Sequence, residues 1–271
     1  MKAAVLGSPV AHSLSPVLHA AGYAELGLAA WSYERFDVQA PDLAGFVAGR
    51  DAEWRGLSLT MPLKEACLGV ASEVTPLARR AGAGNTLVRL PSGGWLAENT
   101  DVPGLVDALR PQWDDGWTRA AILGAGATAR SAVLALADLG VGRVQVYARN
   151  QAKGQQLVAW AAMAAPGIDL SWAPLETWLA GSEPAIVSTL PGGAADDVDM
   201  PGPRAGLLFD AVYAGWPTPL ARAAASAGMT VVGGLDLLVH QAARQFTLFT
   251  GRPAPLEVMF AAGRAALGEA S

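Results

Sequence analysis

The sequence contains one cysteine and three histidines among its 271 residues, and it has no basic run. The single cysteine, Cys67, excludes internal disulfides and cysteine-based metal clusters, and we interpret it as a small buried apolar side chain. No histidine has a carboxylate or a second histidine at ligand spacing, so we expect no metal ion. A net charge of −5 without clustered cations argues against binding to nucleic acid.

Long apolar runs are also missing. The longest candidate, Leu157–Ala165, is far shorter than the ~20 residues that a membrane-spanning helix needs. The first residues, Met1–Gly7, lead directly into Ser8-Pro9, which is typical of a first strand and not of a signal peptide. We therefore expect a cytoplasmic protein that does not bind membranes. Its length allows one large domain or two medium ones.

A short apolar run, a glycine turn and a helix pattern follow one another in the middle of the chain. Residues 120–123 are typical of a buried parallel strand, and residues 127–137 are mostly strong helix formers. Between them, Gly124, Gly126 and Ala129 have the spacing of a dinucleotide-binding turn, in which small residues let a pyrophosphate and the helix approach closely. An ordinary strand-to-helix turn is the alternative, and the flanking strand and helix favour dinucleotide binding.

The next strand pattern indicates which dinucleotide is bound. It covers residues 143–150 and ends about 20 residues after the glycines, where NAD-binding folds place an acidic residue. Arg149 stands there instead, and Lys153 follows one helical turn later. These cations suit a 2′-phosphate, so we expect NADP; solvated basic residues in a loop are the alternative.

Two serines precede the first predicted helix, residues 17–26. Ser15 is suited to cap this helix, and Pro16 is suited to its first position. Ser13 and Ser15 together would also place two hydroxyls beside free helix-terminal amides, an arrangement that suits a small carboxylate.

Lysine is scarce in this chain: only Lys2, Lys64 and Lys153 stand among 19 basic residues. Lys64 comes shortly after a predicted strand at residues 56–60, which Pro62 ends. In an arginine-rich background, such a lysine suggests a site that needs a compact ammonium with an adjustable pKa. A solvated loop lysine is the alternative.

Strand and helix patterns alternate along the chain, which predicts an α/β fold with a parallel sheet. Asp101 stands where a helix through residue 109 begins, as an N-cap or as a first-turn acid. A polar, proline-containing connection at residues 110–117 indicates a domain boundary. The other predicted strands cover residues 3–7, 31–37, 87–90, 95–98, 185–189, 207–212 and 229–232, and the other helices residues 42–48, 236–250 and 255–267, with a hairpin between 87–90 and 95–98.

Five short motifs resemble the shikimate dehydrogenase family in their order and spacing. They are Ser13-Leu-Ser15-Pro16, Thr60-Met-Pro62-Leu-Lys64, Gly82-Ala-Gly-Asn85-Thr86, Asn99-Thr100-Asp101, and Gly234 followed seven residues later by Gln241-Ala242. Each motif alone is weak. Together, with a dinucleotide turn between the fourth and the fifth, they are highly specific and span nearly the full chain.

The resemblance implies an α/β substrate domain of residues 1–104, an inserted Rossmann-like, doubly wound NADP domain of residues 105–234, and C-terminal helices, residues 235–271, that return to the substrate domain. Substrate and nicotinamide would meet between the domains. The implied activity is the reversible, NADPH-dependent reduction of 3-dehydroshikimate to shikimate in chorismate and aromatic amino-acid biosynthesis. The only implied partner is this small-molecule substrate, and the protein would be a monomer or a homodimer.

The resemblance also implies roles for individual residues. Lys64 and Asp101 would form the catalytic pair, and Ser13 and Ser15 would hold the substrate carboxylate. The ring hydroxyls and the rest of the substrate would contact Thr60, Asn85, Asp101, Gln241 and Tyr213. The cofactor would contact Gly124, Ala125, Gly126, Ala127, Thr128, Arg149, Lys153, Thr189, Val212, Gly234 and Leu237.

Some positions depart from the family's pattern. Ser58 stands where asparagine is common, which would weaken a polar contact near Lys64, and Leu237 replaces a methionine that would lie near the nicotinamide. One alternative is a quinate/shikimate dehydrogenase that uses NAD, which an acidic residue at the end of the second cofactor strand would favour. Another is a catalytically silent NADP-binding paralogue, which should lack Lys64 or Asp101.

Overall fold

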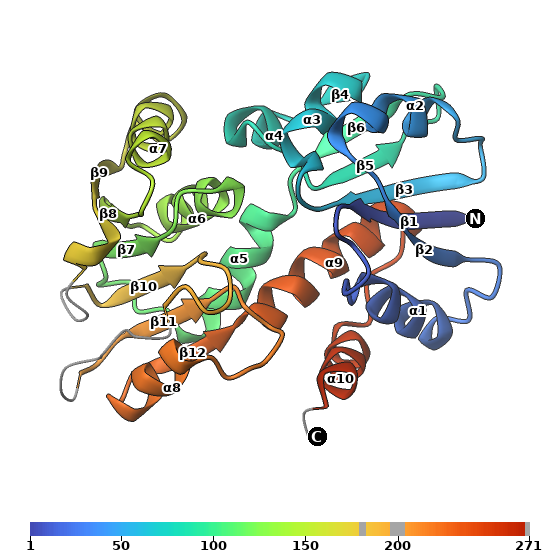
Figure 1. Ribbon diagram of the computed structural model, residues 1–271. Helices are drawn as coiled ribbons and strands as arrows, with labels where there is room; N and C mark the ends of the chain where they lie inside the picture. The colour runs from blue at the N-terminus through green and yellow to red at the C-terminus, as the bar shows by residue number, and fades with distance from the viewer. Residues whose placement is uncertain (179–182, 196–203, 269–271) are drawn as a thin grey trace. The chain divides into compact units, whose positions relative to one another are not determined.

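The computed structural model describes residues 1–178, 183–195 and 204–268 (Figure 1). The chain forms two compact units, Met1–Gly104 with Leu238–Ser271, and Leu105–Leu237. It leaves the first unit within helix α5 (Asp101–Leu109) and returns to it within helix α9 (Gly234–Thr250). The polar connection at residues 110–117 therefore lies inside the second unit, not at a boundary.

The first unit contains a six-stranded mixed sheet in the order β2-β1-β3-β5-β6-β4. Its strands are β1 (Lys2–Gly7), β2 (Ser32–Asp37), β3 (Trp54–Leu59), β4 (Glu73–Val74), β5 (Thr86–Arg89) and β6 (Trp95–Glu98). β1 is parallel to β2 and β3, whereas β5 is antiparallel to β3 and β6. The expectation of a parallel sheet is thus wrong for this unit, because the short turn of the predicted β5–β6 hairpin can join only antiparallel strands.

The helices of the first unit are α1 (Ser15–Glu25), α2 (Leu43–Ala48), α3 (Leu63–Val70), α4 (Pro76–Ala81), most of α9, and α10 (Leu256–Leu267). The sequence patterns do not predict α3, α4 or the short β4. The red helix α10 packs against the blue helix α1, so the two ends of the chain build one unit (Figure 1). Its core contains the fully buried side chains of Leu6, Leu57, Leu63 and Leu87.

The second unit contains a six-stranded sheet in the order β12-β11-β10-β7-β8-β9, in which all neighbours are parallel. Its strands are β7 (Arg119–Leu123), β8 (Arg143–Tyr147), β9 (Asp169–Ala173), β10 (Ala185–Ser188), β11 (Leu207–Asp210) and β12 (Thr230–Gly233). This is the doubly wound strand order of dinucleotide-binding folds, and it confirms the predicted fold class. The direction in which successive strands are added to the sheet reverses between the neighbouring strands β7 and β10. Ligands of such sheets bind at the carboxyl ends of the strands beside that reversal.

Helices α6 (Ala127–Asp138) and α7 (Gln151–Ala164) pack together beside β7 to β9, and α8 (Pro219–Ser226) packs beside β11 and β12 (Figure 1). Three single-turn 3₁₀ helices, η1 (Ala40–Asp42), η2 (Arg110–Gln112) and η3 (Leu175–Thr177), complete the described elements. The sequence patterns do not predict α8 or the edge strand β9. Within the described part of the chain, none of the helices combines the length and the apolarity needed to cross a bilayer.

Candidate active site

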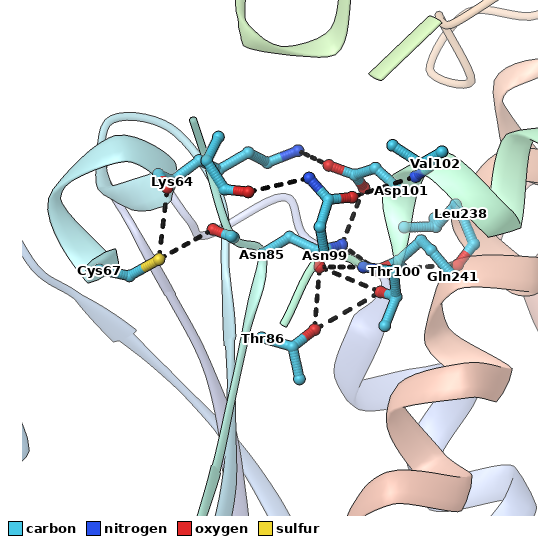
Figure 2. Close-up of polar contacts among 12 residues, drawn as sticks. Lys64, Cys67, Asn85, Thr86, Asn99, Thr100, Asp101, Val102, Leu238 and Gln241 are labelled. Carbon is cyan, nitrogen blue, oxygen red and sulfur yellow. Dashed lines mark hydrogen bonds and ion pairs between the residues drawn. The ribbon is translucent and has the colours of Figure 1, made fainter. Parts of the chain in front are cut away.

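The starts of two helices bring Lys64 and Asp101 together. Lys64 is the second residue of α3, and Asp101 is the first residue of α5. The Lys64 ammonium donates a hydrogen bond of 2.7 Å to Oδ2 of Asp101 (Figure 2), and the two side chains are only 18% and 7% exposed. Charge-assisted bonds are strong when water is largely excluded. Lys64 is therefore not a solvated loop lysine, and Asp101 is the first-turn acid of its helix.

Asn85 holds the second oxygen of the Asp101 carboxylate. Its side-chain amide donates to Oδ1 of Asp101 at 2.8 Å and to Oε1 of Gln241 at 3.2 Å (Figure 2). The Asn85 carbonyl oxygen Oδ1 accepts from the backbone amide of Thr100 at 2.8 Å, which fixes how the side-chain amide is oriented. Four of the predicted site residues, Lys64, Asn85, Asp101 and Gln241, thus form one hydrogen-bonded group.

The backbone around Lys64 is held by Cys67. Its thiol donates to the carbonyl oxygens of Lys64 at 3.3 Å and Gly84 at 3.2 Å, and the Gly84 amide also donates to the Lys64 carbonyl at 2.7 Å. Burial raises the pKa of the Cys67 thiol to about 11, so the sulfur stays protonated and can donate. The prediction that Cys67 is buried is confirmed, but the apolar interpretation missed these two hydrogen bonds.

Thr60 lies at the end of β3, next to this group. Its amide donates to Leu6 at 2.9 Å, and its carbonyl accepts from the Leu63 amide at 2.8 Å. These backbone bonds tie the first turn of α3 to the central strands of the sheet. Thr60 therefore stands beside the helix that carries Lys64.

Ser13 and Ser15 form a second polar group at the start of α1. The Ser13 hydroxyl donates to Oγ of Ser15 and accepts from the Ser15 amide, each at 3.3 Å. The prediction that Ser15 caps the helix is wrong: Ser15 is the first residue of α1, and the capping position belongs to Leu14 without a side-chain cap. The Ser13 oxygen takes the role of accepting a helix-terminal amide.

The glycine turn of the second unit stands at the reversal point of its sheet. Gly124 has a φ of +106°, which favours glycine, and a Cβ there would lie 2.5 Å from Oγ1 of Thr189 after β10. The Thr189 hydroxyl donates to the carbonyl of Leu123 at 2.9 Å, so it holds the strand residue directly before the turn. A Cβ on Gly126 would meet no atom within 4 Å, which leaves open space beside the turn.

Helix α6 begins directly after this turn, with Ala127 and Thr128 in its first positions. Its N-cap, Gly126, makes no side-chain cap, and the first amides of a helix have no partner within the helix. Such amides and the helix dipole attract anions. The residues from Gly124 to Thr128, Ala125 included, therefore fit the phosphates of a dinucleotide.

Arg149 and Lys153 lie exposed near the carboxyl end of β8. Lys153 is in the first turn of α7, whose cap Asn150 accepts the Lys153 amide at 3.0 Å. The indole of Trp172 donates to the Ala148 carbonyl at 3.3 Å and anchors the segment that carries Arg149. Two cations beside a helix N-terminus suit a phosphate group.

The remaining predicted cofactor residues surround the start of α9. A Cβ on Gly234 would lie 2.2 Å from the Ala211 carbonyl, so glycine permits this close approach. The Gly234 amide donates to the Val212 carbonyl at 3.3 Å, and the Val212 amide donates to Asp210 at 3.3 Å. Leu237 in α9 and Tyr213, the predicted substrate contact in this second unit, are half-buried, and burial raises the pKa of the Tyr213 hydroxyl.

Sequence reasoning missed several polar residues behind the first group, namely Tyr33, Thr86, Thr100 and Gln245. Gln245 stands four residues after Gln241, a spacing that places both on one face of a helix and could have indicated it. Ser58, expected only to lose a contact near Lys64, instead bonds to Tyr33 and Gln245. Thr86 and Thr100 belong to two of the five motifs but were given no role, and Tyr33 carries no pattern that singles it out.

Comparisons with known proteins agree over nearly the whole chain. Family models described as "Shikimate dehydrogenase substrate binding domain" and "Shikimate 5'-dehydrogenase C-terminal domain" match residues 5–87 and 234–262. The shikimate dehydrogenase (NADP(+)) of Synechococcus sp. strain JA-3-3Ab is 38% identical over 98% of this chain and 94% of that protein. A solved Mycobacterium tuberculosis shikimate dehydrogenase is 42% identical, with a TM-score of 0.87 over 97% of this chain and 99% of that one. Shikimate 5-dehydrogenase of Thermus thermophilus, solved with NADP(H) and shikimate, is 35% identical, with a TM-score of 0.85 over 98% and 100% of the two chains.

Proposed function

The chain belongs to the shikimate dehydrogenase family, and from this membership we infer that it catalyses the reversible, NADP-dependent reduction of 3-dehydroshikimate to shikimate. This is an oxidoreductase reaction of chorismate and aromatic amino-acid biosynthesis. The observation that carries the assignment on this chain is the shielded contact between Lys64 and Asp101, because a reductase of a carbonyl group needs a positioned proton donor. The same contact argues against a catalytically silent paralogue.

We propose that Lys64 is the catalytic acid and base. NADPH, when bound, supplies the hydride that reduces the carbonyl carbon. The carbonyl oxygen then gains negative charge and must receive a proton, and the Lys64 ammonium can stabilise that charge and donate the proton. In the reverse direction the neutral amine accepts the hydroxyl proton.

Asp101 orients Lys64 in this proposal. An ammonium has three donors, and one of them is bound to the Asp101 carboxylate. The other two can point to the substrate. Asn85 holds the opposite carboxylate oxygen, so the carboxylate cannot rotate freely when Lys64 exchanges its proton.

For substrate binding, we propose that Ser13 and Ser15 hold the carboxylate. The paired hydroxyls at the start of α1, a helix of 11 residues, support this role because they combine donors with a helix N-terminus. The ring hydroxyls and the rest of the substrate would contact Thr60, Asn85, Asp101, Gln241 and Tyr213. Asn85 supports these roles through its direct contact with the Asp101 carboxylate, and Gln241 supports them through its hydrogen bond with Asn85.

For NADP, we propose that residues 124–128 bind the pyrophosphate and that Arg149 and Lys153 bind the 2′-phosphate. The open space beside Gly126 and the basic pair at the start of α7 support these roles. Thr189, Val212, Gly234 and Leu237 would contact the nicotinamide half. At the end of the second cofactor strand, where NAD-binding folds place an acidic residue, this chain has Arg149. This disfavours the alternative of an NAD-dependent quinate/shikimate dehydrogenase. We further propose a cytoplasmic monomer or homodimer.

The test is to replace Lys64 by alanine and follow NADPH absorbance with shikimate and NADP. We expect kcat to fall by about 10²–10⁴-fold with little change in KM, because the lost interaction acts mainly in the transition state. Lys2→Ala is the matched control, since Lys2 forms an exposed ion pair with Glu53 and should leave turnover unchanged. Near-normal turnover of Lys64→Ala would exclude Lys64 from this role. Running the assay with quinate and with NAD tests the alternative substrate and cofactor.

A further inference from the structure

Next to the catalytic pair lies a row of hydrogen-bonded polar side chains, which consists of the half-buried Tyr33 and the buried Ser58, Gln245 and Thr86. None of the steps proposed above uses this row. We propose that Gln245, Ser58 and Tyr33 are positioning residues, which hold Asn85 and through it Asp101 in the orientation that Lys64 needs. This proposal rests on the proposed function of the Lys64 and Asp101 pair.

Gln245 forms the centre of the row. It lies one helical turn after Gln241 on α9 and is 1% exposed. Its side-chain amide donates to the Asn85 backbone carbonyl at 3.1 Å and to Oγ1 of Thr86 at 3.0 Å. The Thr86 hydroxyl in turn donates to Oδ1 of Asn85 at 2.9 Å. Gln245 therefore holds Asn85 in two ways: directly at the Asn85 backbone carbonyl, and through Thr86 at the Asn85 side chain.

Ser58 and Tyr33 continue the row on the other side of Gln245. The Ser58 hydroxyl on β3 donates to Oε1 of Gln245 at 2.7 Å, and the Tyr33 hydroxyl on β2 donates to Ser58 at 2.7 Å. The ring of Tyr33 is stacked on His19 with a centroid distance of 4.1 Å. Burial raises the pKa of Tyr33, opposed by hydrogen bonds to Ser58 and Ser15, so its hydroxyl stays protonated and can donate.

All donors in this row point the same way. Tyr33 donates to Ser58, Ser58 to Gln245, Gln245 to Thr86, and Thr86 to Asn85, whose amide donates to Asp101. Two groups outside the row set this direction at its Asp101 end. The backbone amide of Thr100 can only donate, so Oδ1 of Asn85 must be an acceptor, and the Lys64 ammonium can only donate to Asp101. Hydrogen bonds that share one direction polarise and strengthen one another.

The row also approaches the second polar group of the first unit. Ser13 donates to Ser15 at 3.3 Å, and Ser15 lies close enough to Tyr33 to oppose the rise in the pKa of the Tyr33 hydroxyl. The proposed carboxylate-binding serines therefore lie next to the Tyr33 end of the row. A break at Gln245 should disturb the orientation of Asn85 and Asp101 while leaving Lys64 and the proposed cofactor-binding residues in place.

The experiment compares three variants by steady-state kinetics with shikimate and NADP. Gln245→Met keeps the length of the side chain but removes its amide, and we expect kcat to fall about tenfold with both KM values within about twofold. Ser58→Ala and Tyr33→Phe break the row farther from Asp101, so their effects should be smaller, about threefold or less, in that order. Thr247→Ala is the matched control, since this exposed α9 hydroxyl donates to the Ala243 carbonyl of its own helix and, among the described residues, makes no contact with the row.

Coupling distinguishes a shared network from independent packing. The Ser58→Ala/Gln245→Met double variant should lose no more kcat than Gln245→Met alone, because both changes break the same row. Additive losses, or reduced stability with unchanged kcat, would overturn the proposal. Should Gln245→Met not fold, Ser58→Ala and Tyr33→Phe decide it, and full kcat in both would refute the row.

A second measurement separates this proposal from the proposed function. Wild-type turnover with shikimate and its loss in Lys64→Ala test the function alone. The side-chain amide signals of Asn85 in NMR spectra test the row without any turnover. They should shift in Ser58→Ala and Gln245→Met and stay in place in Thr247→Ala; unchanged signals in the first two would contradict the proposal.

Discussion

His19 should make this protein sensitive to acid. The side chain is fully buried among Tyr33, Phe246 and Phe249, and among the residues the structure describes neither ring nitrogen has a hydrogen-bond partner. Burial lowers the pKa of His19 from 6.5 to about 3, because the apolar surroundings disfavour the charged imidazolium. The folded protein thus keeps His19 neutral at a pH where the unfolded chain binds a proton.

The sign and size of the effect follow from this difference. Below pH 6.5 the unfolded state is stabilised by the proton that the folded state does not take up, so stability falls as the pH decreases from about 6.5 to about 3. Each pH unit in this window costs about 1.4 kcal/mol, so His19 should lower the free energy of unfolding by about 2 kcal/mol at about pH 5 relative to neutral pH.

Urea unfolding at about pH 7 and about pH 5 measures this effect. Carboxylates titrate in the same range, so the informative quantity is the difference between the wild type and His19→Leu, which removes the titrating group without breaking a hydrogen bond. We expect the loss of stability between the two pH values to be about 2 kcal/mol smaller in the variant. His12→Leu is the control, because His12 is exposed. Equal pH dependence of the wild type and His19→Leu would refute the reasoning.

Three further substitutions test the site and the packing of the fold. Asp101→Asn keeps the side-chain shape but removes the charge that holds Lys64, so steady-state assays should show kcat about 10²-fold lower; unchanged kcat would contradict the orienting role. Arg149→Ala should raise the KM for NADP about tenfold or more and leave the KM for NAD nearly unchanged, and equal effects on both cofactors would argue against a 2′-phosphate contact. Gly56→Ala would place a Cβ 2.0 Å from Cδ1 of Phe249, so urea unfolding should show a loss of about 1–3 kcal/mol, and unaltered stability would show that the ring can move aside.

Much of the fold follows from local patterns in the sequence. An apolar run predicts the strand at residues 120–123, the spacing of the glycines predicts the turn at Gly124, and helix propensity predicts the helix that follows. The structure has the strand as β7 and the helix as α6. The helices α3 and α4 are short, and β9 is an edge strand with exposed residues, so their local patterns are weak. The mixed character of the first sheet depends on the pairing of β3 with β5, which no single segment encodes.

The candidate site divides in the same way. Lys64 stands out by the rarity of lysine, and Asp101 by its place at a helix start, and both are recognised by the family's motifs. Their 2.7 Å contact, by contrast, joins residues 37 positions apart and depends on how α3 and α5 are mounted on the first unit. The functional roles of both stay predictions that the substitutions above can test.

Spacing and periodicity over a few residues are enough to predict the glycine turn with its strand and helix, and the five motifs indicate the family and the residue types of the site. The doubly wound order of the second sheet was implied by the family resemblance and not by any local pattern. Which side chains share hydrogen bonds emerges only in the folded chain. Ser58 and Gln245 lie 187 positions apart and meet at 2.7 Å, since β3 and the returning helix α9 pack into one unit. Such contacts require closing a long loop of chain, and their partners are chosen by packing and by the need of buried polar groups for hydrogen bonds, which no local pattern records.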